Sequence, residues 1–76
     1  MVNLRKRSVS LSGHATSLAL EPEFWRVLDE LAARRGLSFA GLIAAIDAGR
    51  GRRPLASACR IAALEWIDQG RPDHFF

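Results

Sequence analysis

The chain has 76 residues, of which 49% are hydrophobic and 25% are charged, a composition typical of one globular domain and unlike that of a disordered chain. Its only cysteine, Cys59, excludes an internal disulfide, and one cysteine with two distant histidines is too small a set for a zinc site. A core of this size is marginal by itself, so we expect oligomerisation to add stability.

Basic residues exceed acidic ones, which gives a formal net charge of +3 and a pI near 10.5. They gather in three clusters, around residues 5–7, 34–35 and 50–53. Arginine is common at solvated loops and helix ends, and it is also the residue that contacts phosphates. Charge alone leaves both interpretations open.

The chain begins with a basic and serine-rich segment, residues 1–13, which we predict to be an N-terminal arm. Val9 and Leu11 alternate with serines, so a short edge strand in this segment is the alternative. Gly13 ends it.

Residues 15–20 alternate large and small side chains in the manner of a β-strand. The larger set, on one face, is Thr16, Leu18 and Leu20, and the smaller set, on the other, is Ala15, Ser17 and Ala19. Pro22 ends the strand because it has no amide hydrogen to donate, and it suits the first turn of a helix.

Three helices are predicted after the strand. The first runs from about residue 22 to residue 35 and ends at Gly36, after two arginines in its last turn. The second begins after Ser38, a good N-cap, and ends near Gly49. The third covers about residues 55–69 and is apolar on most sides, which indicates that a partner subunit covers part of it.

A lone strand cannot satisfy its own backbone hydrogen bonds. Residues 8–12 could fold back on it through Gly13 and His14, or the same strand of a second copy could pair with it. We favour the second copy, because a two-fold axis makes such pairing antiparallel and self-complementary. The resulting two-stranded ribbon has the width of a DNA major groove.

The stretch TSLALEPEFWRVLDELAARRGLSFAGLIAAI, within residues 15–47, resembles the ribbon-helix-helix fold of the Arc and methionine repressors. The opening GHATSLALEPEFW, together with the later LASACRIAALE, also looks like a bacterial branch of that fold with an added C-terminal helix. The resemblance implies a mainly α fold with one short β-strand, in an intertwined homodimer with an antiparallel intersubunit ribbon. The expected parts are a basic arm (1–13), a ribbon-helix-helix core (14–50), an additional helix (51–70) and a tail (71–76).

The resemblance also implies roles for individual residues. Base edges would be touched by the outward strand residues Ala15, Ser17 and Ala19. Phosphates would be bound by the exposed backbone amides of Leu37 and Ser38, at the start of the second helix. They would also be bound by the basic side chains of Arg5, Lys6, Arg7, Arg34 and Arg35. The dimer core would contain Thr16, Leu18, Leu20, Phe24, Trp25, Leu28, Leu31, Leu42, Ile43 and Ile46.

The sequence departs from a base-reading ribbon at two of the three outward positions. Alanine touches a thymine methyl but does not read guanine or cytosine by hydrogen bonding. Two functions are therefore carried forward. The first is a homodimeric DNA-binding regulator of transcription. The second is a protein-interaction module on the same scaffold, including antitoxin-like partner binding.

No catalytic constellation, phosphate loop or metal motif occurs, so we expect neither an enzyme nor a cofactor. No apolar run is long enough to span a membrane, and we expect a cytoplasmic protein. The expected partners are a second copy of the chain and double-stranded DNA. A higher oligomer formed through residues 55–69 and a separate protein partner are left open.

Overall fold

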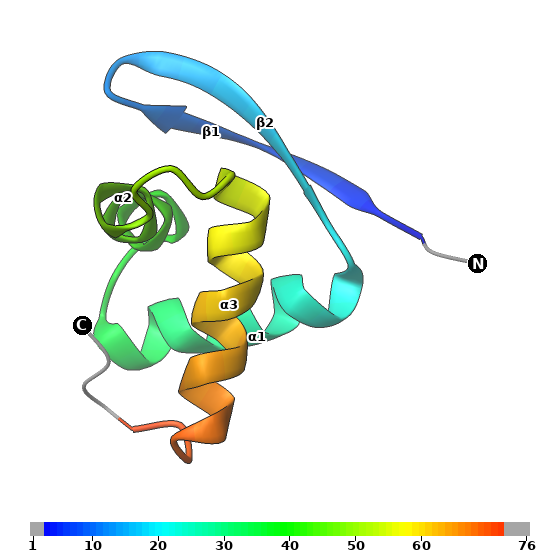
Figure 1. Cartoon of the computed structure of the whole chain (residues 1–76), viewed down its shortest axis with the longest axis vertical. Helices are drawn as coiled ribbons and strands as arrows, with labels where there is room; N and C mark the ends of the chain where they lie inside the picture. Colours follow the sequence, from blue (N-terminus) through cyan, green and yellow to red (C-terminus); the bar gives the residue numbers. More distant parts are fainter. Residues whose placement is uncertain (1–2, 73–76) are drawn as a thin grey trace.

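The computed structural model describes residues 3–72 and contains two strands and three helices. Their order is β1 (Arg5–Leu11), β2 (His14–Leu20), α1 (Pro22–Arg35), α2 (Phe39–Gly49) and α3 (Leu55–Asp68). The two strands form a ribbon that lies over the helices (Figure 1). The predicted fold class, mainly helical with a short ribbon, is confirmed.

The ribbon is a hairpin formed within one chain. β1 and β2 are antiparallel, with Arg5 opposite Leu20 at one end and Leu11 opposite His14 at the other. The turn residues Ser12 and Gly13 have φ angles of 51° and 80°. Positive φ at both central residues is the backbone twist that suits a two-residue hairpin turn.

The structure therefore has two strands where the sequence predicted one. Residues 5–11 form β1, and the partner of the predicted strand comes from the same chain, as in the fold-back alternative. Of the two interpretations of the N-terminal segment, a basic arm or a short edge strand, the strand is the one found over residues 5–11. Its physical reason is the Ser12–Gly13 turn, which reverses the chain in two residues. Pairing between two copies is not part of this single-chain structure.

The helix ends follow their predicted signals closely. Glu21 is extended before Pro22, which occupies the first turn of α1. Gly36 takes a left-handed conformation at φ 67°, and its N–H donates to the Ala33 carbonyl at 3.1 Å. The Ser38 hydroxyl accepts from the Gly41 N–H at 3.0 Å and caps α2. The predicted bounds of α1, α2 and α3 are confirmed to within a residue or two.

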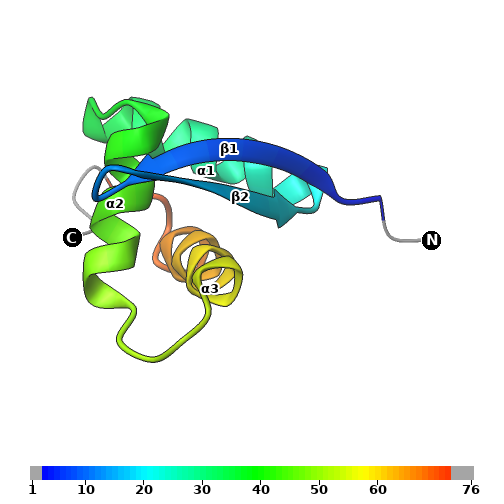
Figure 2. The same ribbon diagram turned by 90° about the horizontal axis from the view of Figure 1, so that it is seen from above.

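The core lies where the three helices meet beneath the ribbon (Figure 2). The side chains with no exposed surface are Leu20, Leu28, Leu31, Leu42, Ile43, Cys59, Ala63 and Trp66. Burying each large one contributes about 1.5–3 kcal/mol before the loss of chain entropy is subtracted. The buried face of α3 packs on both α1 and α2, so this helix belongs to the chain's own core.

Most of the predicted core residues are buried within the single chain. Those buried are Leu18, Leu20, Trp25, Leu28, Leu31, Leu42, Ile43 and Ile46, and Phe24 is half-buried. Thr16, which was predicted to lie in the dimer core, is exposed in the single chain. It lies near the turn end of the ribbon, and Val9, opposite it on β1, is the buried residue of this pair.

The chain turns back after α3. The Arg71 N–H donates to the Trp66 carbonyl at 2.9 Å, and the Trp66 indole N–H donates to the Pro72 carbonyl at 2.8 Å. The predicted tail, residues 71–76, is thus ordered at its start, and residues 73–76 lie outside the described part.

Candidate nucleic-acid interface

The ribbon has an outward face that points away from the helices. Opposite residues on the two strands share a face, so the cross-strand pairs Lys6–Ala19, Ser8–Ser17 and Ser10–Ala15 lie together on it. We call these six residues the outward face. All are exposed except Ala19, which is half-buried.

The sequence predicted only half of this surface. Ala15, Ser17 and Ala19 lie on the outward face as expected, but the partner strand adds an ammonium group and two hydroxyl groups that had not been assigned to it. The alternation of Ser8 and Ser10 with apolar neighbours was the signal that could have placed them there.

The chemistry of the outward face is that of a modest hydrogen-bonding surface. Lys6 supplies a cationic donor, which suits guanine O6 and N7, and serine hydroxyls both donate and accept. The two alanines suit thymine methyl groups. Apart from Lys6, these side chains are small, so the backbone of the ribbon can approach a groove floor closely.

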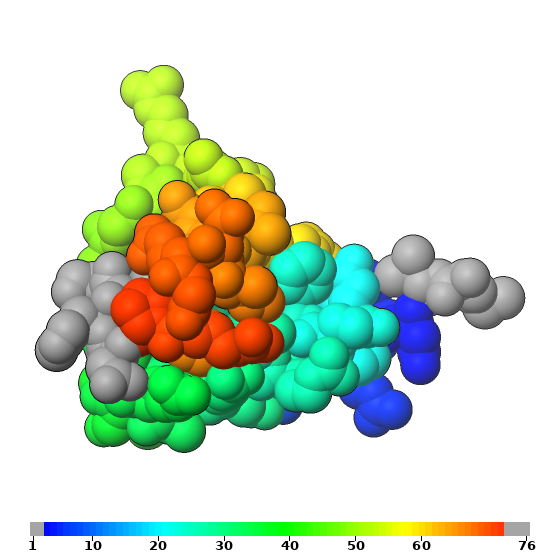
Figure 3. All heavy atoms as spheres, turned by 90° about the horizontal axis from the view of Figure 1, so that it is seen from below, coloured from blue at the N-terminus to red at the C-terminus, as the bar shows by residue number. Residues whose placement is uncertain are grey.

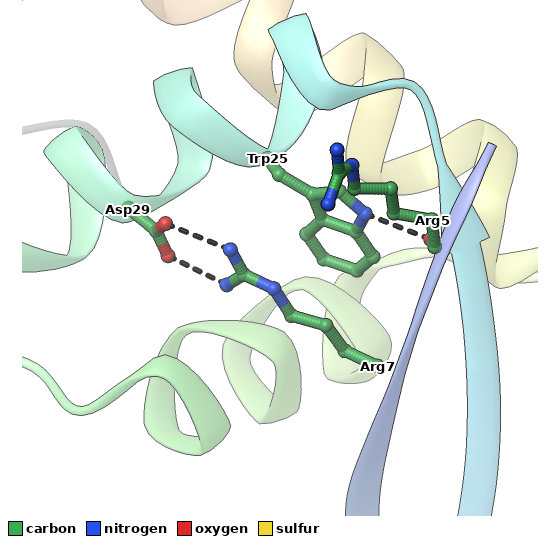
Figure 4. A network of polar contacts seen from close by, with 4 residues as sticks. All are labelled: Arg5, Arg7, Trp25 and Asp29. Carbon is green, nitrogen blue, oxygen red and sulfur yellow. Dashed lines mark hydrogen bonds and ion pairs between the residues drawn. The ribbon is translucent and has the colours of Figure 1, made fainter. Parts of the chain in front are cut away.

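Arg7 points the other way, into the space between the ribbon and α1. Its two terminal nitrogens donate to the Asp29 carboxylate at 2.8 and 2.9 Å (Figure 4). Its guanidinium also lies 4.6 Å from the centroid of the Trp25 ring and 4.9 Å from that of Phe39. The hydrogen bond to Asp29 raises the pKa of Arg7 above its ordinary value.

This arrangement gives Arg7 a different task from the predicted phosphate contact. The carboxylate and the two rings occupy its guanidinium, which thereby ties β1 to α1 and α2. Trp25 adds to the same contact, because its indole N–H donates to the Arg5 carbonyl at 2.9 Å (Figure 4).

The remaining predicted phosphate ligands fall into two separate groups. Arg5 and Lys6 lie beside the start of α1, whereas Arg34, Arg35, Leu37 and Ser38 lie at or after its end. A helix of this length spans about 20 Å, so the two groups do not form one site. Arg34 and Arg35 sit in the last turn of α1, where positive charge complements the helix dipole.

The backbone amide predicted to bind phosphate at Leu37 is already used. It donates to the Ala32 carbonyl at 2.9 Å as part of the C-terminal cap of α1. Ser38 likewise uses its hydroxyl oxygen to cap α2. The prediction that Leu37 offers an exposed amide is therefore wrong, because the tight turn after Gly36 consumes that amide.

The described residues offer little to catalysis or to metal binding. Within residues 3–72, no group of three His, Cys, Asp or Glu side chains comes together to hold a metal ion. Cys59 is fully buried, and burial raises the pKa of its thiol to about 11. A thiol in this state is a core side chain and not a nucleophile. None of the helices in the described part is long and apolar enough to cross a membrane.

The ribbon, its outward face and the helix pair behind it define a class of small binding domain. The ribbon-helix-helix domain family matches residues 4–67, and the chain belongs to this family. The family's domains are regulatory binding domains.

One solved structure supports the same fold. It is that of an uncharacterized protein from Bordetella pertussis Tohama I, with 31% sequence identity and a TM-score of 0.75. The match covers 93% of this chain and 63% of the Bordetella chain, so this chain spans less than two thirds of that protein's length. No curated protein matches the chain.

Proposed function

We propose that the protein is a homodimeric DNA-binding regulator of transcription that inserts its ribbon into the major groove. The observation that carries this proposal is the exposed outward face, which presents one ammonium and three hydroxyl groups on a two-stranded ribbon of groove width. Membership of the ribbon-helix-helix family supports it. The proposed place of action is the cytoplasm, on chromosomal DNA.

The hairpin changes how two copies would associate. Each strand of a two-stranded sheet has one edge without a strand neighbour, and that edge can pair with a strand of another copy. We propose that the two copies meet through the edges of their β2 strands around a two-fold axis. Antiparallel pairing there is self-complementary, and the two paired β2 strands then form the two-stranded ribbon of groove width, with a β1 strand on either side of it.

A matched pair of charge variants tests the proposed DNA contact. Ser17→Glu places a carboxylate at the centre of the outward face, and Gln69→Glu makes the same change of net charge after the end of α3. We expect Ser17→Glu to weaken duplex binding by about tenfold or more, because the carboxylate faces DNA phosphates and base acceptors, and Gln69→Glu to change it by less than about twofold.

The measurement is fluorescence anisotropy with a mixed-sequence duplex at low and at raised salt. Wild-type binding should weaken steeply as salt rises, since phosphate contacts release counterions. Absence of wild-type binding at low salt, or equal effects of the two variants, would contradict the proposal.

A second candidate function rests on α3. Leu64 and Ile67, about one turn apart on this helix, are 59% and 38% exposed. Exposed apolar surface of this kind favours a protein-interaction role, either with a partner protein, as in an antitoxin, or with a further copy of this chain. A variant with Leu64→Ser and Ile67→Ser that keeps DNA affinity but loses a partner would favour this function.

A further inference from the structure

An open hollow of about 500 Å³ lies between the start of β1 and the first turns of α1. Its lining includes four basic residues and one acidic residue. The lining residues are Arg5, Lys6, Arg7, Pro22, Trp25, Arg26 and Asp29. The start of β1 and the start of α1 also lie side by side in Figures 2 and 4.

Most of the positive charge in this hollow has no acidic partner. Asp29, its one carboxylate, is bound by both terminal nitrogens of Arg7. The ion pairs found within residues 3–72 involve neither Arg5, Lys6 nor Arg26. Three like charges held around one hollow raise the local potential and attract an anion.

The hollow is also held in shape before any ligand arrives. Trp25, which lines it, is only 3% exposed, and its indole N–H is fixed by the Arg5 carbonyl. The Arg7–Asp29 pair lies beside the Trp25 ring, with the Arg7 guanidinium 4.6 Å from the ring centroid, and it ties β1 to α1 there (Figure 4). A preformed site loses less conformational entropy on binding than a pair of mobile arginines would.

We propose that this hollow binds a phosphate of the DNA backbone, with Arg26 of α1 completing a site that Arg5 and Lys6 begin. Lys6 belongs both to the hollow and to the outward face, so the two surfaces are continuous. Phosphates flank the major groove, and guanidinium groups match their oxygens in pairs. This inference rests on the proposed DNA binding, and it adds a residue of α1 that the ribbon alone would not predict.

The test removes one charge from the hollow and, as a control, one charge from the opposite end of the molecule. Arg26→Gln is compared with Arg52→Gln, because Arg52 is exposed in the loop between α2 and α3, which lies away from the starts of β1 and α1 (Figure 3). We expect Arg26→Gln to weaken binding several-fold on every duplex sequence. A plot of the logarithm of the binding constant against the logarithm of the salt concentration has a negative slope. The variant should make that slope less steep by about 1 for each hollow. Arg52→Gln should change neither quantity.

The two tryptophans provide a local readout that does not depend on affinity. The Trp25 indole N–H lies at the hollow, whereas the Trp66 indole N–H binds the Pro72 carbonyl at the far end. Adding duplex DNA should shift the Trp25 indole resonance in a ¹⁵N-correlated spectrum and leave that of Trp66 unchanged. The Arg26→Gln variant should reduce the Trp25 shift.

The outcomes separate this inference from the proposed function. If wild-type protein binds DNA and Arg26→Gln behaves as Arg52→Gln does, the phosphate site is wrong and DNA binding stands. A loss on one sequence alone would indicate a base contact and would also overturn the phosphate site. If wild-type protein binds no DNA at low salt, the phosphate site and the proposed DNA-binding function are both overturned. An acidic protein would then be the class of ligand to examine.

Discussion

Arg7 joins three elements through one planar group. Its guanidinium makes two hydrogen bonds to Asp29 of α1 and lies close to the Trp25 and Phe39 rings, which belong to α1 and α2. The two rings are themselves 5.4 Å apart in an edge-on arrangement. Lysine has the same charge but neither the fork that matches a carboxylate nor the flat surface that stacks on rings.

The Arg7→Lys variant is therefore expected to lower the free energy of unfolding. The Arg7 and Asp29 side chains are 37% and 50% exposed, so solvent screens the pair and the expected loss is only about 1 kcal/mol. The control is the reverse exchange at the preceding residue, Lys6→Arg, which faces outward and should change stability by less than about 0.5 kcal/mol. Urea unfolding at fixed protein concentration measures both, and equal midpoints for Arg7→Lys and wild type would refute this role.

Arg7 and its neighbours show that a cluster of basic residues in the sequence does not indicate which way each side chain points. Arg5, Lys6 and Arg7 form one basic triplet in the sequence, but a strand sends successive side chains to opposite faces. Once β1 exists, Lys6 faces outward and Arg7 faces the helices. The phosphate role predicted for the whole triplet could not be divided correctly, because the segment was interpreted as an arm.

At the scale of elements, an ion pair joins the start of α1 to α3. The Arg60 Nη2 lies 2.8 Å from the Glu21 carboxylate, and each side chain is about a third exposed. A hydrogen bond from its own backbone amide and then one from Arg60 lower the pKa of Glu21. Since the pKa of the folded protein lies below that of the unfolded chain, the ionised form stabilises the fold.

This stabilisation has a defined dependence on pH. It is fully present above the pKa of Glu21 in the unfolded chain and is lost as pH falls through the lowered pKa of the folded state. We expect Glu21→Gln to lower the melting temperature at pH 7, with the difference from wild type shrinking as the solution is acidified. Glu23→Gln, in the same turn and outside the described ion pairs, is the control and should show a smaller difference. A gap between wild type and Glu21→Gln that stays constant down to low pH would argue against the pair.

The elements themselves were predictable to very different degrees. The bounds of α1 and α2 could be predicted because Pro22, Gly36 and Ser38 act locally, through backbone geometry and hydrogen bonds a few residues away. The hairpin was only an alternative, because Ser12 must also adopt a left-handed conformation for the turn to close. Serine shows no preference for that conformation strong enough to be seen in a sequence.

At the scale of the whole molecule, the single chain already has a closed core and a paired ribbon. The inference that a lone strand required a second copy therefore no longer holds in its original form. What still favours association is surface chemistry, namely the second edge of β2 and the exposed Leu64 and Ile67. The resemblance identified the fold because strand, helix and tight turn occur in the right order. It could not show which side chains use their polar groups within the chain.

The oligomeric state is directly measurable. We expect size-exclusion chromatography with light scattering to give 16.8 kDa, twice the 8.4 kDa of one chain, because two β2 edges satisfy each other's backbone groups. Ala15→Pro removes one backbone donor from the free edge of β2, because Ala15 and Ser10 form a non-hydrogen-bonded pair of the hairpin, and it should shift the equilibrium toward the monomer. Ser10→Pro makes the same change on β1 and is the control, which should leave the equilibrium unchanged. A folded wild-type protein of 8.4 kDa at all concentrations would rule the dimer out.

The Ser12–Gly13 turn also affects how fast the ribbon forms. A hairpin closed by two residues forms within about 1–10 μs, whereas association of two chains takes milliseconds or longer and depends on their concentration. β1 and β2 also precede the three helices along the chain, so they are synthesised before those helices. Each chain can therefore complete its own ribbon before it meets another copy, and the rate at which the ribbon appears should not depend on how much of the protein a cell contains.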